Sequence, residues 1–169
     1  PDSYANSNKH YPVLYLLDGG RHINQTILAT EILQKQERIP ELIIVAITNT
    51  DVWENGAGQR QRDLGYAGKD NFLLYIKKEV MPYVDTHYRT TGLNTLFGHS
   101  LAGYFTTNVL ATQPELFKNY IAASPVQQKS HPDRQPPSDK NHLAPHSANQ
   151  ASTSKVENLS AMHLPVHLS

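Results

Sequence analysis

The sequence predicts an α/β fold with an open, mostly parallel β-sheet and flanking helices. Short apolar runs, typical of strands that are buried on both faces, alternate with longer amphipathic segments. Glycine or proline borders several of these runs, as expected where strands begin or end. Strands that alternate with helices form right-handed β–α–β units, and such units produce a parallel sheet.

The first three predicted elements lie before residue 48. Residues 11–18 (YPVLYLLD) form an apolar run that two glycines close, which predicts a buried strand. A helix is expected over 23–36, because apolar residues recur there at helical spacing. They are Ile27, Leu28, Ile32 and Leu33. Residues 41–47 (ELIIVAI) follow a proline and predict a second buried strand.

The remaining elements follow a polar, glycine-containing stretch over 48–68. This stretch predicts a loop that is longer than connections in compact domains usually are. Helical periodicity returns over 70–88, and Pro82 is expected to kink the last turn of this helix. The later elements are a strand at 94–97, a helix at 101–112 and a strand at 120–124.

The composition changes abruptly after Pro125. All the aromatic residues (one Trp, nine Tyr and four Phe) and all nine glycines precede this position. The residues that follow are rich in His, Pro, Ser, Gln and Asn and have little to bury, so they gain too little to offset the entropy of ordering. We therefore predict a partial domain over 1–125 and a low-complexity, disordered tail over 126–169.

The bulk composition excludes several classes of function. Fifteen basic and fifteen acidic residues are evenly mixed, so no net field attracts nucleic acid or an anionic membrane. No apolar run reaches the roughly 20 residues of a membrane-spanning helix. The absence of cysteine removes disulfides, thiolate metal sites and cysteine nucleophiles. Neither the cellular compartment nor the oligomeric state follows from the sequence.

The segment GHSLAG, residues 98–103, lies between a predicted strand and a predicted helix. It matches the G-x-S-x-G nucleophile elbow, with Ala102 in place of the last glycine. A strand that turns sharply into a helix leaves no room for bulky residues two positions from the serine. Ser100 is therefore the predicted nucleophile, and the Leu101 N–H is expected to point into the space beside it. A chance match is the competing interpretation, and the strand–helix context favours the elbow.

A second loop of interest, Asp18-Gly19-Gly20, closes the first predicted strand. In a parallel sheet this strand end lies at the same edge as Ser100, so the Gly20 N–H can join the Leu101 N–H in an oxyanion hole. Each such donor is worth about 3 kcal/mol of transition-state stabilisation. The alternative is that the loop is only a turn.

Three histidines near these segments have other expected roles. His99 lies inside the elbow and is expected to be a packed, hydrogen-bonded support. His22 and His87 are expected at the surface or at helix ends. A phosphate-binding loop is not an alternative for the two glycine-containing segments, because the sequence has neither G-x-G-x-x-G nor G-K-[ST].

Five sequence blocks between Tyr4 and Pro125 resemble, in order, the putative-esterase group of α/β-hydrolases, which includes enterochelin-esterase-like and siderophore-esterase-like proteins. The blocks are YPVLYLLDGG, RIPELIIVAITNTD, RDLG, DNFLLYIKKEVMPYVDTHYRT and LFGHSLAGYFTTNVLATQPELFKNYIAASP. The resemblance implies an α/β-hydrolase-type fold and a serine carboxylic-ester hydrolase without metal or cofactor. It implies an acyl-enzyme on Ser100, oxyanion donors from Gly20 and Leu101, and a small ester substrate, siderophore-like esters included.

The sequence departs from this group in the loop and at both ends. An insertion, VWENGAGQ, separates Asn49-Thr50-Asp51 from Arg62-Asp63-Leu64, and Gly65-Tyr66 replace threonine-proline in a loop that borders the family's pocket. The first strands of the fold and the strands, acid and histidine expected after Pro125 are not recognisable, so the domain is expected to be truncated at both ends.

A complete catalytic triad would need an acid and a base from the tail. Asp133 or Asp139, with His163 or His167, would keep the chain order of α/β-hydrolases. The tail has nothing to hold a histidine within about 3 Å of the serine oxygen. The alternative to an active esterase is therefore a non-catalytic, truncated or frameshifted remnant that lacks acid and base.

Overall fold

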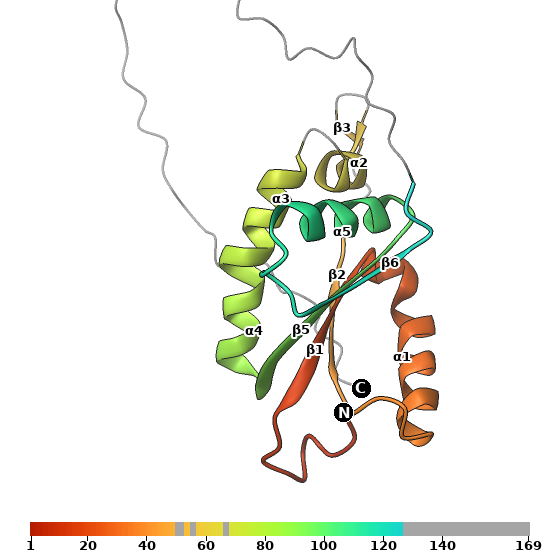
Figure 1. Ribbon diagram of the computed structural model, residues 1–169, viewed down its shortest axis with the longest axis vertical. Helices are drawn as coiled ribbons and strands as arrows, with labels where there is room; N and C mark the ends of the chain where they lie inside the picture. The colour runs from red at the N-terminus through yellow and green to blue at the C-terminus, as the bar shows by residue number, and fades with distance from the viewer. Residues whose placement is uncertain (50–52, 55–56, 66–67, 127–169) are drawn as a thin grey trace, which may run out of the picture. The chain divides into compact units, whose positions relative to one another are not determined.

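The described residues form a four-stranded parallel sheet flanked by helices, in agreement with the predicted α/β fold (Figure 1). The computed structural model describes residues 1–49, 53–54, 57–65 and 68–126. The strands lie in the order β2-β1-β5-β6, and every neighbouring pair is parallel. Their bounds are β1 (Tyr11–Leu17), β2 (Ile43–Ile47), β5 (Thr90–His99) and β6 (Asn119–Ala123).

Helices cover the two faces of the sheet unequally. The helical segments are α1 (Gly19–Lys35), α2 (Gln59–Leu64), α3 (Lys69–Tyr75), the π-helical turn η1 (Ile76–Val80), α4 (Met81–His87) and α5 (Leu101–Thr112). Figure 1 shows α1 on one side of the sheet, with α3 and α4 on the other. Of the described helices, none is long and apolar enough to cross a membrane.

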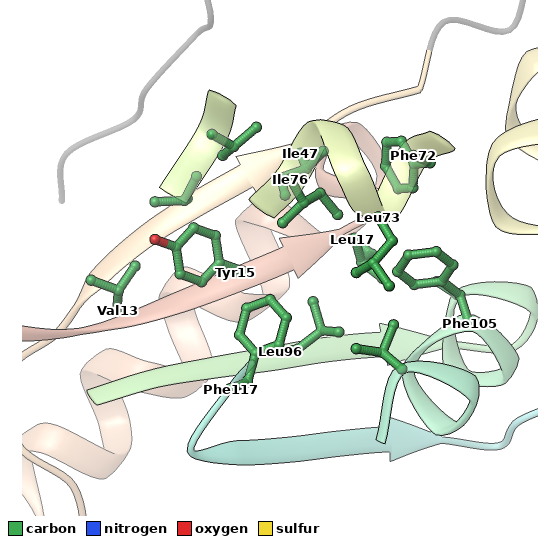
Figure 2. Packing of buried hydrophobic residues seen from close by; sticks show 14 of the residues in the cluster. Val13, Tyr15, Leu17, Ile47, Phe72, Leu73, Ile76, Leu96, Phe105 and Phe117 are labelled. Atoms are coloured by element: carbon green, nitrogen blue, oxygen red, sulfur yellow. The ribbon is translucent and has the colours of Figure 1, made fainter. Parts of the chain in front are cut away.

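The larger core lies on the α3–α4–α5 side of the sheet (Figure 2). Side chains alternate between the faces of a strand, so Val13, Tyr15 and Leu17 of β1 all point to this side. They pack with Leu96 of β5 and with residues of α3, η1, α4 and α5, including Phe105. Burial of these large side chains is the main apolar contribution to stability.

The opposite face carries a much smaller core. Leu14 and Leu16 of β1 and Ile44 of β2 form it, together with half-buried residues of α1 such as Ile27. The predicted apolar stripe of α1 is otherwise largely open to solvent, with Leu28 59%, Ile32 47% and Leu33 39% exposed. Helix α1 packs Ile27 against the small core of β1 and β2, and Leu28, Ile32 and Leu33 remain partly exposed.

The predicted loop 48–68 contains regular structure. Two short antiparallel strands, β3 (Trp53–Glu54) and β4 (Ala57–Gly58), precede helix α2. The helix is too short to show a hydrophobic period, and its anchor is one fully buried side chain, Leu64. This explains why the prediction of a plain loop was wrong here.

The largest other differences from the prediction are two element starts and the place of one helical irregularity. Helix α1 begins at Gly19, and β5 begins at Thr90, because Thr90 already pairs with Tyr11 of β1. Residues 70–88 are helical, but the irregularity is η1, and Pro82 lies just after it at the start of α4 and not in the last turn. Proline cannot donate the next helical hydrogen bond, and prolines and π turns are both sites where helices depart from regular α geometry.

Candidate active site

The strand order places the two loops of interest side by side. From β1 the chain crosses to β2 on one side and later returns to β5 on the other side of β1. The carboxyl ends of β1 and β5 therefore flank a topological switch point, where open α/β sheets bind their ligands. Asp18 follows β1 there, and Ser100 follows β5.

Ser100 has the strained backbone that the predicted nucleophile elbow requires. Its φ of 58° and ψ of −116° are values that residues with a side chain rarely adopt. A Cβ atom on Gly98 would lie 2.2 Å from the carbonyl oxygen of Ala102, so only glycine fits at that position. Ala102 is fully buried, which explains why a small residue follows the serine at this spacing.

Strand β6 and the residues just after it hold the turn at Ser100 in place. The Ser100 N–H donates to the Ala123 carbonyl over 2.9 Å, and the Val126 N–H donates to the Ser100 carbonyl over 3.3 Å. Gly103 packs against the same strand, where an added Cβ would lie 2.9 Å from the Ala123 oxygen. The strain at Ser100 is thus supported by contacts with residues more than 20 positions away in the chain, which no local motif encodes.

The loop after β1 is held by an ion pair that the sequence reasoning missed. The Asp18 side chain is buried, and the Asp18 backbone has a left-handed conformation with φ 54°. The guanidinium of Arg60 in α2 donates two hydrogen bonds to the Asp18 carboxylate, from Nε to Oδ1 over 2.6 Å and from Nη2 to Oδ2 over 2.7 Å. The available signal was a carboxylate that directly follows a buried strand.

The two glycines of this loop have different steric surroundings. A Cβ on Gly19 would lie 2.7 Å from the Ala46 side chain, so the close approach to β2 requires glycine there. A Cβ on Gly20 would make only an ordinary contact, 3.7 Å from Thr48 Cγ2. Gly20 is therefore not required by space.

The predicted oxyanion donors both lie in the first turn of a helix. Gly20 is in the first turn of α1, and Leu101 opens α5. Within the described part of the chain, neither N–H donates to a backbone carbonyl. Helix N-termini leave such donors unpaired and place positive partial charge beside them. This arrangement is suited to an anion, and the assignment of these two donors stays a prediction.

His99 does not have the expected supporting role. It is exposed, and its ring packs edge to face against His22 of α1, with centroids 5.5 Å apart. Side chains alternate along β5, so His99 points to the α1 side, away from the large core that contains Leu96. His22 is half-buried at the start of α1, and His87 ends α4 as predicted.

A pocket of about 700 Å³ extends from these histidines along the α1 side of the sheet. Its walls are mainly apolar and come from α1, β1, β5 and β6; Leu14, Phe97 and Ile121 are among them. The two histidines give one end of this pocket polar character.

A base for Ser100 is not found among the described residues. Within them, the Ser100 hydroxyl makes no side-chain hydrogen bond, and no three potential metal ligands come together. The candidate acids and bases of the tail, Asp133, Asp139, His163 and His167, lie outside the described residues. Within the loop, Asn49 and Arg62 both donate to Asp63, over 3.1 and 3.0 Å.

Comparison with known proteins identifies the family. Residues 1–164 match the family model described as "Putative esterase". The chain belongs to this esterase family. Among curated relatives, the ferri-bacillibactin esterase BesA of Bacillus subtilis is 30% identical over 141 residues, which cover 68% of this chain and 47% of that protein. The chain thus spans about half the length of this relative.

Solved structures of related proteins agree with this assignment. An IroE-like serine hydrolase from Shewanella oneidensis has a TM-score of 0.60 and 32% identity, over 72% of this chain and 43% of that one. The siderophore hydrolase EstA from Aspergillus nidulans has a TM-score of 0.58 and 29% identity, over 74% of this chain and 49% of that one. These hydrolases support the α/β-hydrolase-type fold of the described residues.

Proposed function

We propose that this chain carries the nucleophile and the oxyanion hole of a serine carboxylic-ester hydrolase. The observation that carries the proposal is the backbone of Ser100, which is left-handed and strained between β5 and α5 at the switch point of the sheet. Strain of this kind persists only where surrounding contacts support it, and it gathers at functional sites. Family membership adds independent support.

In the proposed reaction, Ser100 Oγ attacks the carbonyl carbon of an ester and the C=O electron pair moves onto oxygen. The N–H groups of Gly20 and Leu101 donate to this oxyanion. The carbonyl then re-forms as the alcohol leaves with a proton, and an acyl-enzyme remains on Ser100. Water attacks the acyl carbon, the bond to Ser100 Oγ breaks, one proton of the water returns to that oxygen, and the acid is released. Such donors stabilise charge that is present only in the transition state and so raise kcat.

The substrate class follows from the relatives. BesA is named a ferri-bacillibactin esterase and EstA a siderophore hydrolase, and a further relative is named a siderophore triacetylfusarinine C esterase. We propose a small ester, siderophore-like esters included, as the substrate of this chain. The proposed steps use no metal or cofactor.

Labelling with a fluorophosphonate and hydrolysis of p-nitrophenyl acetate test this function, with Ser100→Ala as the control. We expect slow labelling and slow hydrolysis, both lost in Ser100→Ala. The rates should be low because no base contacts Ser100 among the described residues, while an oxyanion hole alone retains about 10³-fold catalysis over water. Equal rates in the protein and in Ser100→Ala would overturn the proposal and leave a non-catalytic remnant.

A further inference from the structure

The ion pair between Asp18 and Arg60 joins the candidate oxyanion loop to helix α2. It links residues 42 positions apart, and the Asp18 side chain is only 2% exposed while that of Arg60 is 21% exposed. A buried carboxylate is costly unless it is paired and hydrogen-bonded, and the two parallel hydrogen bonds of an arginine fork meet that need. The fork also fixes the orientation of the carboxylate, which a single contact would not do.

The backbone next to this pair leads directly to Gly20. Asp18 is left-handed, its carbonyl accepts the Arg21 N–H over 2.9 Å, and its carboxylate is held by Arg60. Gly19 is confined against β2, because even a Cβ atom would collide with Ala46. Gly20 is not confined in this way, since an added Cβ would make only an ordinary contact with Thr48. The position of its N–H therefore depends on the two residues before it.

Arg60 is itself held by its helix. Leu64 of α2 is fully buried in the large core, and Asp63 accepts a hydrogen bond from Asn49 just after β2. Helix α2 follows directly on β4 in the segment that the sequence predicts as a loop. Through its ion pair with Asp18, Arg60 can therefore fix the Asp18 turn relative to the packed helix α2.

We propose that Arg60 is a positioning residue for the oxyanion hole: through Asp18 it holds the turn that aims the Gly20 N–H at the substrate carbonyl. This inference rests on the function proposed above. Arg60 acts through Asp18 and does not touch the substrate. A purely structural ion pair is the competing explanation, and it would affect stability without affecting the reaction of the folded protein.

Kinetics of three variants separate the two explanations. Arg60→Met leaves Asp18 unpaired, Arg60→Lys restores charge without the fork, and Asp18→Asn with Arg60→Met removes the pair without a buried, unpaired charge. With p-nitrophenyl acetate, we expect Arg60→Met to lower kcat about 10- to 100-fold with KM within about twofold, because oxyanion donors act on the transition state. Arg60→Lys should recover part of this loss.

The double variant is the decisive one. We expect it to regain most of the thermal stability lost in Arg60→Met while kcat stays low. Lys77→Met is the control, since Lys77 lies in η1 and donates to Gln113, at the end of α5 opposite Ser100; its kcat should not change. Recovery of kcat together with stability in the double variant would overturn the proposal.

A readout without turnover keeps the inference separate from the proposed function. In ¹⁵N-glycine-labelled protein, the Gly19 and Gly20 amide resonances should shift or broaden in the double variant, while those of Gly98 and Gly103 stay in place. Absence of Ser100-dependent hydrolysis in the unmodified protein would defeat the proposed function, but not the positioning of Gly20. An unchanged Gly20 resonance in the double variant would defeat the positioning.

Discussion

At the scale of single residues, Ser100 shows how a local motif depends on distant contacts. The GHSLAG segment requires glycine at position 98, because the Ala102 carbonyl leaves no room for a Cβ atom there. The left-handed turn at Ser100 is in turn stabilised by β6, through the hydrogen bond from its N–H to Ala123. A serine in this conformation costs about 1–3 kcal/mol, a cost that glycine would largely avoid.

The strain predicts that Ser100→Gly will be more stable than Ser100→Ala. Alanine keeps the Cβ that is unfavourable at φ 58°, whereas glycine accepts this backbone. We expect a difference of only about 1 kcal/mol in the free energy of unfolding in favour of glycine, because the larger entropy of glycine in the unfolded chain offsets part of the relieved strain. Urea unfolding of both variants measures it. Equal stability, or a less stable glycine variant, would show that the turn stores little strain.

Tyr15 is a second residue whose surroundings predict a measurable effect. Its hydroxyl is buried in the large core without a hydrogen-bond partner among the described residues (Figure 2). Burial, with a smaller contribution from the Asp85 carboxylate, raises the pKa of Tyr15, so the phenol stays neutral. We expect Tyr15→Phe to stabilise the protein by about 1 kcal/mol, because it removes an unsatisfied buried polar group.

Tyr120→Phe is the matched control for Tyr15→Phe. The Tyr120 hydroxyl accepts the Phe117 N–H over 3.1 Å and lies 3.0 Å from the Gln113 carbonyl, so its loss should destabilise by about 1 kcal/mol. Thermal unfolding of both variants would reveal the opposite signs. A destabilised Tyr15→Phe protein would mean that the Tyr15 hydroxyl has a partner such as a buried water.

At the scale of elements, the strands and long helices are predictable, but the elements that complete the site are not. Apolar runs identify β1 and β2, and helical periodicity identifies the region from α3 to α4, because residues of each element are buried in the large core. Helix α2 is too short for a period, yet it supplies Arg60. Strand β5 begins earlier than predicted. Its first residues are held by pairing with β1 and not by hydrophobic burial, so they leave no apolar signal in the sequence.

The segment before β1 provides a pH-dependent test at this scale. The N–H and the hydroxyl of Ser3 both donate to the Glu41 carboxylate, and Ser3 also contacts the Tyr11 hydroxyl over 2.7 Å. The hydrogen bonds from Ser3, first among the causes, lower the pKa of Glu41 below its ordinary value of 4.5. A lowered folded-state pKa adds stability above the unfolded value, and this stability is lost as pH falls through the folded value.

We therefore expect Glu41→Gln to be less stable than the unmodified protein at pH 7, by no more than about 1 kcal/mol, because the group lies near the surface. The difference should shrink as the pH falls below 4.5. Melting temperatures of both proteins between pH 7 and pH 3 measure it. A difference that does not depend on pH would mean that the Glu41 charge does not hold the segment.

At the scale of the whole molecule, the described residues leave one sheet face only partly covered. On the α1 side, Leu93 of β5 is 52% exposed and Ile121 of β6 is 47% exposed. Within the described residues, β2 and β6 are also the two edges of the sheet. Exposed apolar surface beside an open strand edge favours association with other chains.

The 169-residue protein is therefore expected to self-associate. Ile121→Lys should shift it toward the monomer, because it places a charge on both the apolar face and the edge strand. Leu74→Lys on α3 is the matched control, since Leu74 is 53% exposed but lies on a helix that covers the other side of the sheet. Size-exclusion chromatography with light scattering measures the effect. A monodisperse monomer that melts cooperatively would contradict the expectation.

The sequence by itself determines the fold class, the elbow at Ser100 and the glycine loop after β1. These features depend on residues that are close together in the chain: the alternation of apolar runs, and the small residues that a sharp strand–helix turn requires. The chemistry expected at Ser100 follows from the same short segment, and its test lies in the kinetics of the serine variants.

Only the tertiary structure decides how these pieces meet. The strand order brings Asp18 and Ser100 to one switch point, the packing of α2 brings Arg60 to Asp18, and β6 supports the strained serine. It also turns His99 toward His22 and leaves much of the α1 stripe exposed. Each depends on contacts between residues far apart in the chain, whose pairing is set by sheet order and burial and which no local pattern encodes.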